Sequence, residues 1–236
     1  MFVNSSATNT AIVRQGAANP HLKMLHISGN QKVVSGAIVK LASKCTKLVH
    51  VEIRNCPNIT DSAVRALARQ CRDMVYIDLT NCKCVTNRSI VELTSNCFDI
   101  AHVILGGTSV TDEGLKILAR SYPNLLSIDV SRCVRITNES ARALGQHCNF
   151  LRSASFAATR IDNIGVIELA SCRKLEVLKL NDCAKVTDIA MPALTDFCPQ
   201  LKSLNVKNTG VTKVGIMILK TNCNELDEVV MSAADA

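Results

Sequence analysis

The 236-residue sequence contains no tryptophan, and aromatic residues make up only 3% of it. It has no apolar run near the roughly 20 residues that a membrane-spanning helix needs. Its first twenty residues lack the basic segment and sustained apolar core of a secretory signal. We therefore expect neither a membrane span nor secretion. With 47% hydrophobic residues and so few aromatics, the core must be filled by Leu, Ile, Val, Ala and Cys.

Motifs for catalysis and for phosphate binding are also missing. No G-x-S-x-G, P-loop or G-x-G-x-x-G pattern occurs, so we predict neither enzymatic activity nor a cofactor. The net charge is +7, but the basic residues are dispersed along the chain, without a Lys run or interleaved aromatics. A dispersed positive charge is more typical of a solvated surface than of a nucleic-acid-binding track. No nucleic-acid partner is predicted.

What the sequence does contain is a repeat. The stretch from Cys45 to Cys71 reads CTKLVHVEIRNCPNITDSAVRALARQC, and its pattern returns from Cys71 and again from Cys172. The shared pattern is C-x-x-L-x-x-L-x-L-x-x-C-x-x-[IV]-T-[DN], followed by an apolar-periodic run. A period of about 26 residues is typical of a solenoid, in which no single repeat can bury its own apolar face.

Each repeat divides into a strand, a turn and a helix. Residues 51–53 alternate between apolar and charged, which predicts a strand with one buried face. Thr60 then provides a side-chain oxygen at the start of a helical run, in which Val64 and Leu67 share one face. One strand and one helix in every repeat predict a sheet of parallel strands.

The twelve cysteines follow the same period, because eleven of them fall in two columns of the repeat. The column at the helix end holds Cys45, Cys71, Cys97, Cys148, Cys172, Cys198 and Cys223, with Tyr122 in the remaining place. The turn column holds Cys56, Cys82, Cys133 and Cys183, with Asn30, Thr108, Thr159 and Thr209 in the equivalent places of the other repeats. We expect buried, reduced thiols in both columns, and in the turn column a short polar or thiol side chain that hydrogen-bonds backbone of the neighbouring turn. Only Cys84 lies outside the columns, and no metal site is predicted.

The repeats set the expected organisation of the chain. Residues 1–18 form a degenerate N-terminal half-repeat, residues 19–223 form eight cysteine-containing repeats, and residues 224–236 form a final strand and a short tail. Terminal repeats normally carry a polar outer face. Because none is evident here, we expect the ends to be covered by neighbouring subunits, the termini to be closely docked, or the chain to be a fragment.

With these residues assembled, the sequence resembles the cysteine-containing leucine-rich repeat family over residues 20–223. The resemblance implies an α/β solenoid, a right-handed horseshoe with parallel strands inside the curve and helices outside. Proteins of this kind are most often substrate-receiving parts of F-box ubiquitin-ligase receptors, and a smaller relative, the antagonist of mitotic exit network protein, is nearly all repeat. Residues 1–18 contain no Leu or Pro, so we expect no F-box there.

A candidate binding site follows from the strand register. Side chains that point away from the helices should line the concave face, where neighbouring strands lie about 4.8 Å apart. This register predicts a row of His50, Tyr76 and His102, next to a cluster formed by Glu52, Arg54 and Asp78. We interpret these six residues as the contact surface for a protein partner. Tyr76 would anchor the contact, and the charged residues would set the orientation of the partner.

Two functions remain open on the sequence alone. The first is a non-catalytic interaction module, for substrate recognition or scaffolding of the ubiquitin-ligase or cell-cycle type. The second is a structural subunit built into a large cytoskeletal or axonemal assembly. Both imply protein partners and a cytoplasmic, nuclear or cytoskeletal location.

Overall fold

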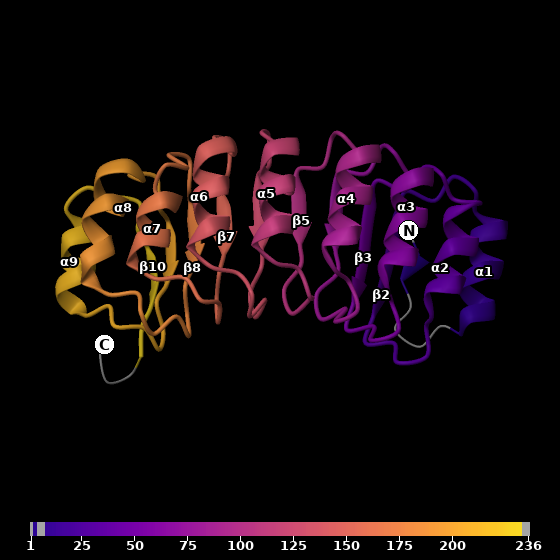
Figure 1. Ribbon diagram of the computed structural model, residues 1–236, viewed down its shortest axis with the longest axis horizontal. Coiled ribbons are helices and arrows are strands. Elements are labelled where there is room, and N and C mark those ends of the chain that lie inside the picture. Colours follow the sequence, from indigo (N-terminus) through magenta and orange to yellow (C-terminus); the bar gives the residue numbers. More distant parts are fainter. Residues whose placement is uncertain (1, 4–7, 233–236) are drawn as a thin grey trace. The chain divides into compact units, whose positions relative to one another are not determined.

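The computed structural model describes residues 2–3 and 8–232, and the chain forms two compact units, residues 1–122 and 123–236. In each unit one strand alternates with one helix along the chain (Figure 1). The elements of the first unit are β1 (Phe2–Val3), α1 (Asn9–Ala18), β2 (Met24–Ser28), α2 (Ser35–Ala42), β3 (His50–Arg54), α3 (Asp61–Gln70), β4 (Tyr76–Asp78), α4 (Asn87–Asn96), β5 (His102–Ile104) and α5 (Asp112–Ser121). Those of the second unit are β6 (Ser127–Asp129), α6 (Asn138–His147), β7 (Ser153–Ser155), α7 (Asn163–Leu169), β8 (Val177–Lys179), the 3-10 helix η1 (Asp188–Ala190), α8 (Met191–Phe197), β9 (Ser203–Asn205), α9 (Lys213–Lys220) and β10 (Glu228–Val230).

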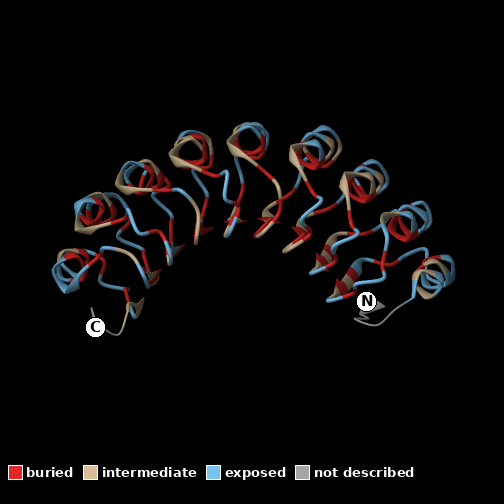
Figure 2. Cartoon of the chain, turned by 60° about the horizontal axis from the view of Figure 1, so that its bottom comes forward, coloured by how far each residue is buried: buried red, intermediate tan, exposed pale blue. Residues whose placement is uncertain are grey.

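The strands of each unit form a parallel sheet in chain order, as the repeat predicted. Val51 pairs with Leu25 on one side and Ile77 on the other, and Ile77 pairs with Val103. All four are fully buried against the helices, so the predicted strand register is confirmed. Figure 2 shows that within each unit the buried residues gather between the strands and the helices. The opposite side of each sheet carries no helices, and we call it the sheet face.

The Thr residues at the helix starts act largely as predicted. Thr60, Thr86 and Thr137 accept a hydrogen bond from a backbone N–H of their own helix. Thr111 makes no such bond, and its hydroxyl accepts from the side chain of Asn87 in the preceding repeat. Thr187 caps a 3-10 turn that precedes α8.

At most helix starts the residue after the cap is Asp or Asn, and it connects neighbouring repeats, which the sequence pattern did not reveal. The Oδ1 atom of Asp61 accepts bonds from the backbone N–H of Thr86 (2.8 Å) and the hydroxyl of Ser89 (2.6 Å), and its Oδ2 accepts from the Thr86 hydroxyl (2.7 Å). Equivalent bonds to the next cap residue are made by Asn87, Asn138, Asn163 and Asp188. We call these contacts the Asx ladder.

The Asx ladder also explains a column of small residues in the helices. A Cβ at Gly114 would lie 2.4 Å from Oδ1 of Asn87, and one at Gly215 would lie 2.2 Å from Oδ1 of Asp188. Both separations are far shorter than a carbon–oxygen contact can be. The ladder oxygen of one repeat therefore requires a small residue in the next.

The cysteines of both columns are buried, and Cys84 is exposed. At the helix ends, Cys71 donates to the carbonyl of Cys45 and Cys198 donates toward that of Cys172, one repeat earlier. In the turns, Cys82 donates across repeats to the carbonyl of Ile53 (3.0 Å), which lies in β3 rather than in the neighbouring turn. The Thr members instead bond within their own repeat, as Thr108 does to Leu105 (2.7 Å). The predicted bond to backbone of the neighbouring repeat is thus present for Cys82, with an acceptor in the strand, while Thr108 uses a carbonyl of its own repeat.

Two further features were not predicted. Residues 2–3 form a strand, β1, that pairs in parallel with β2. In addition, the residue before each turn-column position has a positive φ, and these residues are Gly29, Asn55, Asn81, Gly107, Arg132, Ala158, Asp182 and Asn208. Glycine and asparagine tolerate this left-handed conformation, whereas alanine and arginine do so at a cost in energy.

Candidate partner-binding site

The six predicted residues come together on the sheet face of the first unit, because they occupy matching positions on β3, β4 and β5. His50 pairs with Tyr76, and Tyr76 with His102, while Glu52 pairs with Asp78. Each lies on the side of its strand that points away from the buried Val51 and Ile77.

The three rings form a continuous row. His50 stacks on Tyr76 with ring centroids 4.0 Å apart and planes only 4° from parallel, and Tyr76 meets His102 at 5.8 Å and 36°. All three are half-buried. Stacked rings hold one another in place, so a partner would meet a surface that is already ordered.

Glu52 is the centre of the charged cluster. Its two carboxylate oxygens contact Nε2 of His50 (2.8 Å) and Nδ1 of His26 (2.6 Å), and Nη2 of Arg54 lies 3.2 Å away. Burial alone would raise the pKa of Glu52, but its bonds to His50, Arg54 and His26 outweigh that effect and lower it. Glu52 is therefore a carboxylate at neutral pH.

Asp78 lies beneath Arg54 rather than on the surface, since only 2% of the residue is exposed. The Nε atom of Arg54 donates to Oδ2 of Asp78 (2.5 Å), while the backbone N–H and the hydroxyl of Thr80 both donate to Oδ1 (2.8 and 2.6 Å). Although burial acts in the opposite direction, the pKa of Arg54 is raised, chiefly by the bond to Asp78. Asp78 thus positions Arg54, and Arg54 presents the charge.

Two of the three rings in the row, Tyr76 and His102, are neutral for physical reasons. Burial, followed by the nearby charge of Asp78, raises the pKa of Tyr76. Burial, followed by the neighbouring His50, lowers the pKa of His102. At neutral pH the row therefore offers a phenol and an uncharged imidazole, which suit contact with a polar or aromatic group.

His26 and Thr80 belong to this cluster, but the sequence-based prediction did not include them. Both were visible in the register, His26 one repeat before Glu52 and Thr80 two residues after Asp78. Their roles depend on side-chain conformation, which spacing alone does not give.

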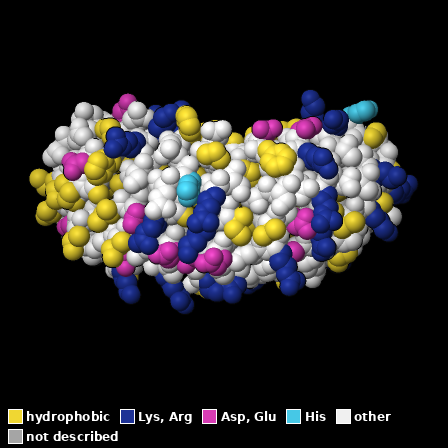
Figure 3. Space-filling model, turned by 45° about the horizontal axis from the view of Figure 1, so that its top comes forward, with side chains coloured by type: hydrophobic (Ala, Val, Ile, Leu, Met, Phe, Trp, Pro, Cys, Tyr) yellow, Lys and Arg dark blue, Asp and Glu magenta, His cyan; other side chains and the backbone are white. Residues whose placement is uncertain are grey.

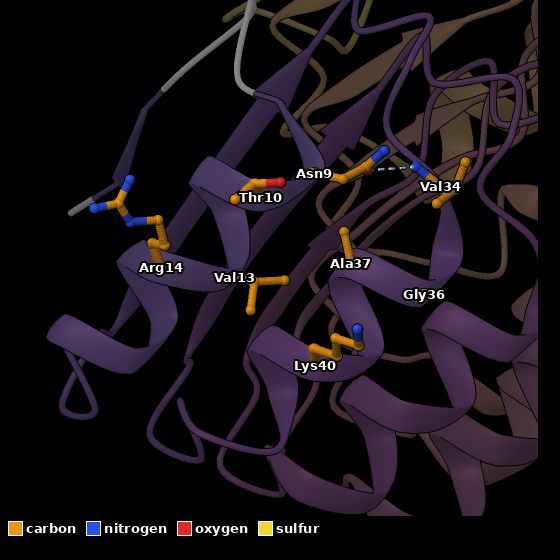
Figure 4. A pocket seen from close by; sticks show the side chains of 8 residues that line it. All are labelled: Asn9, Thr10, Val13, Arg14, Val34, Gly36, Ala37 and Lys40. Atoms are coloured by element: carbon orange, nitrogen blue, oxygen red, sulfur yellow. Dashed lines mark hydrogen bonds between the residues drawn. The ribbon is translucent and has the colours of Figure 1, made fainter.

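The arrangement shows no sign of a metal centre or an enclosed active site. No group of three or more His, Cys, Asp or Glu side chains in residues 8–232 is arranged to hold a metal ion. An apolar groove lies between α1 and α2, lined in part by Val13, Val34 and Lys40, and it contains none of the six residues (Figure 4). Among the described helices, none is both long and apolar enough to cross a membrane.

The parallel strands, the helices and the repeat define an α/β solenoid of the leucine-rich repeat type. The family described as Leucine Rich repeat matches residues 44–68. The chain is 32% identical over 116 residues to antagonist of mitotic exit network protein 1 of Saccharomyces cerevisiae, and 28% identical over 149 residues to the protein of that name from Candida glabrata. These matches cover 45% and 49% of this chain but only 21% and 29% of those proteins.

A solved structure of the yeast Rad7–Elc1 complex has the same fold. The superposition covers 87% of this chain and 68% of the other, with a TM-score of 0.52 and 16% sequence identity. At this identity the likeness concerns the fold. Together these comparisons support a protein-interaction role for the chain.

Proposed function

We propose that this chain is a non-catalytic recognition module, for substrate recognition or scaffolding of the ubiquitin-ligase or cell-cycle type, and that it binds its partner on the sheet face of the first unit. The observation that carries this proposal is the stacked row of His50, Tyr76 and His102. Tyrosine is among the residues that most often dominate binding energy at interfaces. Here its ring is held in place before any partner arrives.

The cluster beside the row supports the same reading. Arg54 is fixed by Asp78, and Glu52 is fixed by His50 and Arg54, so little side-chain entropy remains to be lost on binding. Arg54 stays partly exposed and can donate to a partner carboxylate or carbonyl. The rings supply contact area and the guanidinium supplies orientation.

The cell-cycle part of the proposal depends on the relatives. Two of them carry the name antagonist of mitotic exit network protein 1, and the chain covers less than a third of either. The ubiquitin-ligase part depends on the family resemblance. Both are expectations about the partner, whereas the binding surface consists of residues of this chain.

The test uses a photo-crosslinking residue in place of His102, in native extract, to identify the partner. The purified partner is then titrated against the wild-type chain and Tyr76→Ala. Loss of a central aromatic anchor should weaken binding by about 2 kcal/mol, roughly 30-fold, with no change in thermal midpoint.

Arg69→Ala on α3 is the matched control, because Arg69 lies on the helix side and pairs with Glu92 there. It should leave the affinity unchanged. If Arg69→Ala abolishes binding while Tyr76→Ala binds normally, the partner uses the helix side and the proposal is wrong.

A further inference from the structure

An apolar patch lies on the helix side of the second unit. It consists of Ile164 and Ile167 of α7, Ile189 of η1, Pro192 of α8, and Val214 and Met217 of α9, and we call these six residues the apolar patch. The five besides Pro192 are between 44% and 72% exposed. Figure 3 shows hydrophobic side chains gathered over the end of the chain where α8 and α9 lie.

The apolar patch occupies equivalent positions in three consecutive repeats. Ile164, Ile189 and Val214 each stand two residues after a cap residue, and the other three follow at a spacing of three residues. On α3, α4 and α5 of the first unit the same positions hold polar residues except at Val91, namely Ser62 and Arg65, Arg88 and Val91, and Glu113 and Lys116. The fold therefore does not require apolar side chains there. Large exposed apolar groups that the fold does not require mark interaction surfaces.

Most of the unpaired charges around the apolar patch are positive. Arg160 and Lys185 lie in the turns before α7 and η1, Lys213 begins α9, and all three are exposed. Among the described residues, none of the three takes part in an ion pair.

Two of the nearby carboxylates, by contrast, are already engaged. Glu168 accepts from Nε of Arg142 at 2.9 Å, and Asp188 accepts from the backbone and hydroxyl of Thr212. Asp196, one turn after Pro192 on α8, is exposed. Three basic side chains against one carboxylate leave a net positive charge to attract a ligand.

We propose that the apolar patch binds an acidic amphipathic helix of a partner protein, lying across α7, α8 and α9. Packed helices are about 8–10 Å apart, and residues seven apart on a helix are separated by about 10.5 Å. One apolar residue in every seven would therefore meet each of the three repeats in turn. The acidic side chains would face Arg160, Lys185 and Lys213. A bilayer fits less well, because the carboxylates of Glu168 and Asp188 stand among the apolar residues.

This site shares no residue with the sheet face of the first unit, so it can be tested separately. The probe is a fluorescein-labelled synthetic peptide of about 18 residues, with leucines at heptad spacing on one face and glutamates on the other. Its fluorescence anisotropy should rise saturably with the wild-type chain. A peptide with lysine in place of each glutamate should bind at least about tenfold more weakly.

The decisive variant is Ile189→Glu combined with Met217→Glu. Both side chains are at least 70% exposed, so the thermal midpoint should not change while peptide affinity falls at least about tenfold. Arg88→Glu is the matched control, because Arg88 occupies the position of Ile189 on α4. It should leave peptide binding intact. Hydrogen exchange should show protection by the peptide within residues 163–220.

Several results would overturn the proposal. These are no saturable binding below about 1 mM peptide, equal binding of the glutamate and lysine peptides, or unchanged affinity in the double variant. Self-association of the chain that Met217→Glu abolishes would identify a second copy as the occupant. Sedimentation with phosphatidylserine vesicles that depends on Met217 would identify a bilayer instead.

Discussion

The Asx ladder should be a major source of stability, and Asp61→Ala is the sharpest test of it. The change deletes three hydrogen bonds to one carboxylate, and it leaves the backbone N–H of Thr86 and the hydroxyl of the fully buried Ser89 without their acceptor. Hydrogen bonds to charged groups contribute about 1.5–3 kcal/mol each, and the half-buried setting of Asp61 reduces that. We expect a loss of about 2–4 kcal/mol in the free energy of unfolding.

Two matched variants separate this effect from a general change of charge. Asp61→Asn retains an acceptor oxygen, and Asn87 already fills the same position one repeat later, so it should cost less than about 1 kcal/mol. Asp73→Ala removes a carboxylate whose only described ion pair is an exposed contact with Lys47 at 3.7 Å. It should change the stability by less than about 0.5 kcal/mol. Urea unfolding followed by circular dichroism measures all three.

The pH dependence gives a second measurement of the same contacts. Burial would raise the pKa of Asp61, but its bonds to Ser89 and Thr86 outweigh that effect and lower it. A carboxyl whose folded pKa is depressed stabilises the fold above its unfolded pKa, near 3.8, and the contribution is lost as pH falls through the folded value. The wild-type chain should therefore lose more stability than Asp61→Ala between neutral pH and pH 3. If Asp61→Ala and Asp73→Ala cost the same, the ladder is not a source of stability.

Three further predictions concern the core, the thiols and the turns. Leu79→Ala should lower the free energy of unfolding by about 2–5 kcal/mol, because Leu79 is fully buried. Lys179→Ala, at an exposed strand position, should change it by no more than about 0.5 kcal/mol. Equal urea midpoints for the two variants would contradict the strand register. Under native conditions a thiol reagent should label Cys84 first, because Cys84 is exposed whereas burial raises the pKa of a column thiol such as Cys71 to about 12. Denaturation without reductant should expose about twelve reactive thiols. A count near half of that would mean disulfides. Ala158→Gly should stabilise the chain by about 0.5–1 kcal/mol, because Ala158 has a φ of 53°, a left-handed conformation that costs alanine energy and glycine does not resist. A lower urea midpoint in this variant would show that the turn is not strained.

The sequence was sufficient for the repeat, the strand register and most helix caps, since these depend on side-chain type at fixed spacing. Val51 and Ile77, for example, were placed inward by period alone. The Asx ladder was missed because an Asp after a Thr is equally well explained as part of its own helix start. The burial of Asp78 was missed because an outward position in the register does not show that the neighbouring Arg54 folds over it.

The candidate site shows the same division. Register brought His50, Tyr76 and His102 into one row, and the structure places the rings in contact. Side-chain rotamers decide which polar groups face a partner and which only hold other side chains in place. His26 and Thr80, for example, hold Glu52 and Asp78. Gly29 and Gly107 are residues that indicate a left-handed backbone conformation before the turn column. Arg132 and Ala158 occupy the same position in other repeats, and their residue types do not indicate a positive φ.

The Asx ladder also sets a rule for building longer or shorter versions of this chain. A repeat can be inserted or deleted without loss of stability only under two conditions. Its first helical residue must supply a hydrogen-bond acceptor, and the third residue of the next helix must be small. Splicing a copy between α3 and α4 meets both conditions, through Asp61 and Ser89. A copy placed after α9 does not, because Lys213 stands where Asp188 stands one repeat earlier and has no acceptor to give. Engineered extension at that junction would need Lys213→Asp, so the direction in which the ladder runs decides where new binding surface can be added.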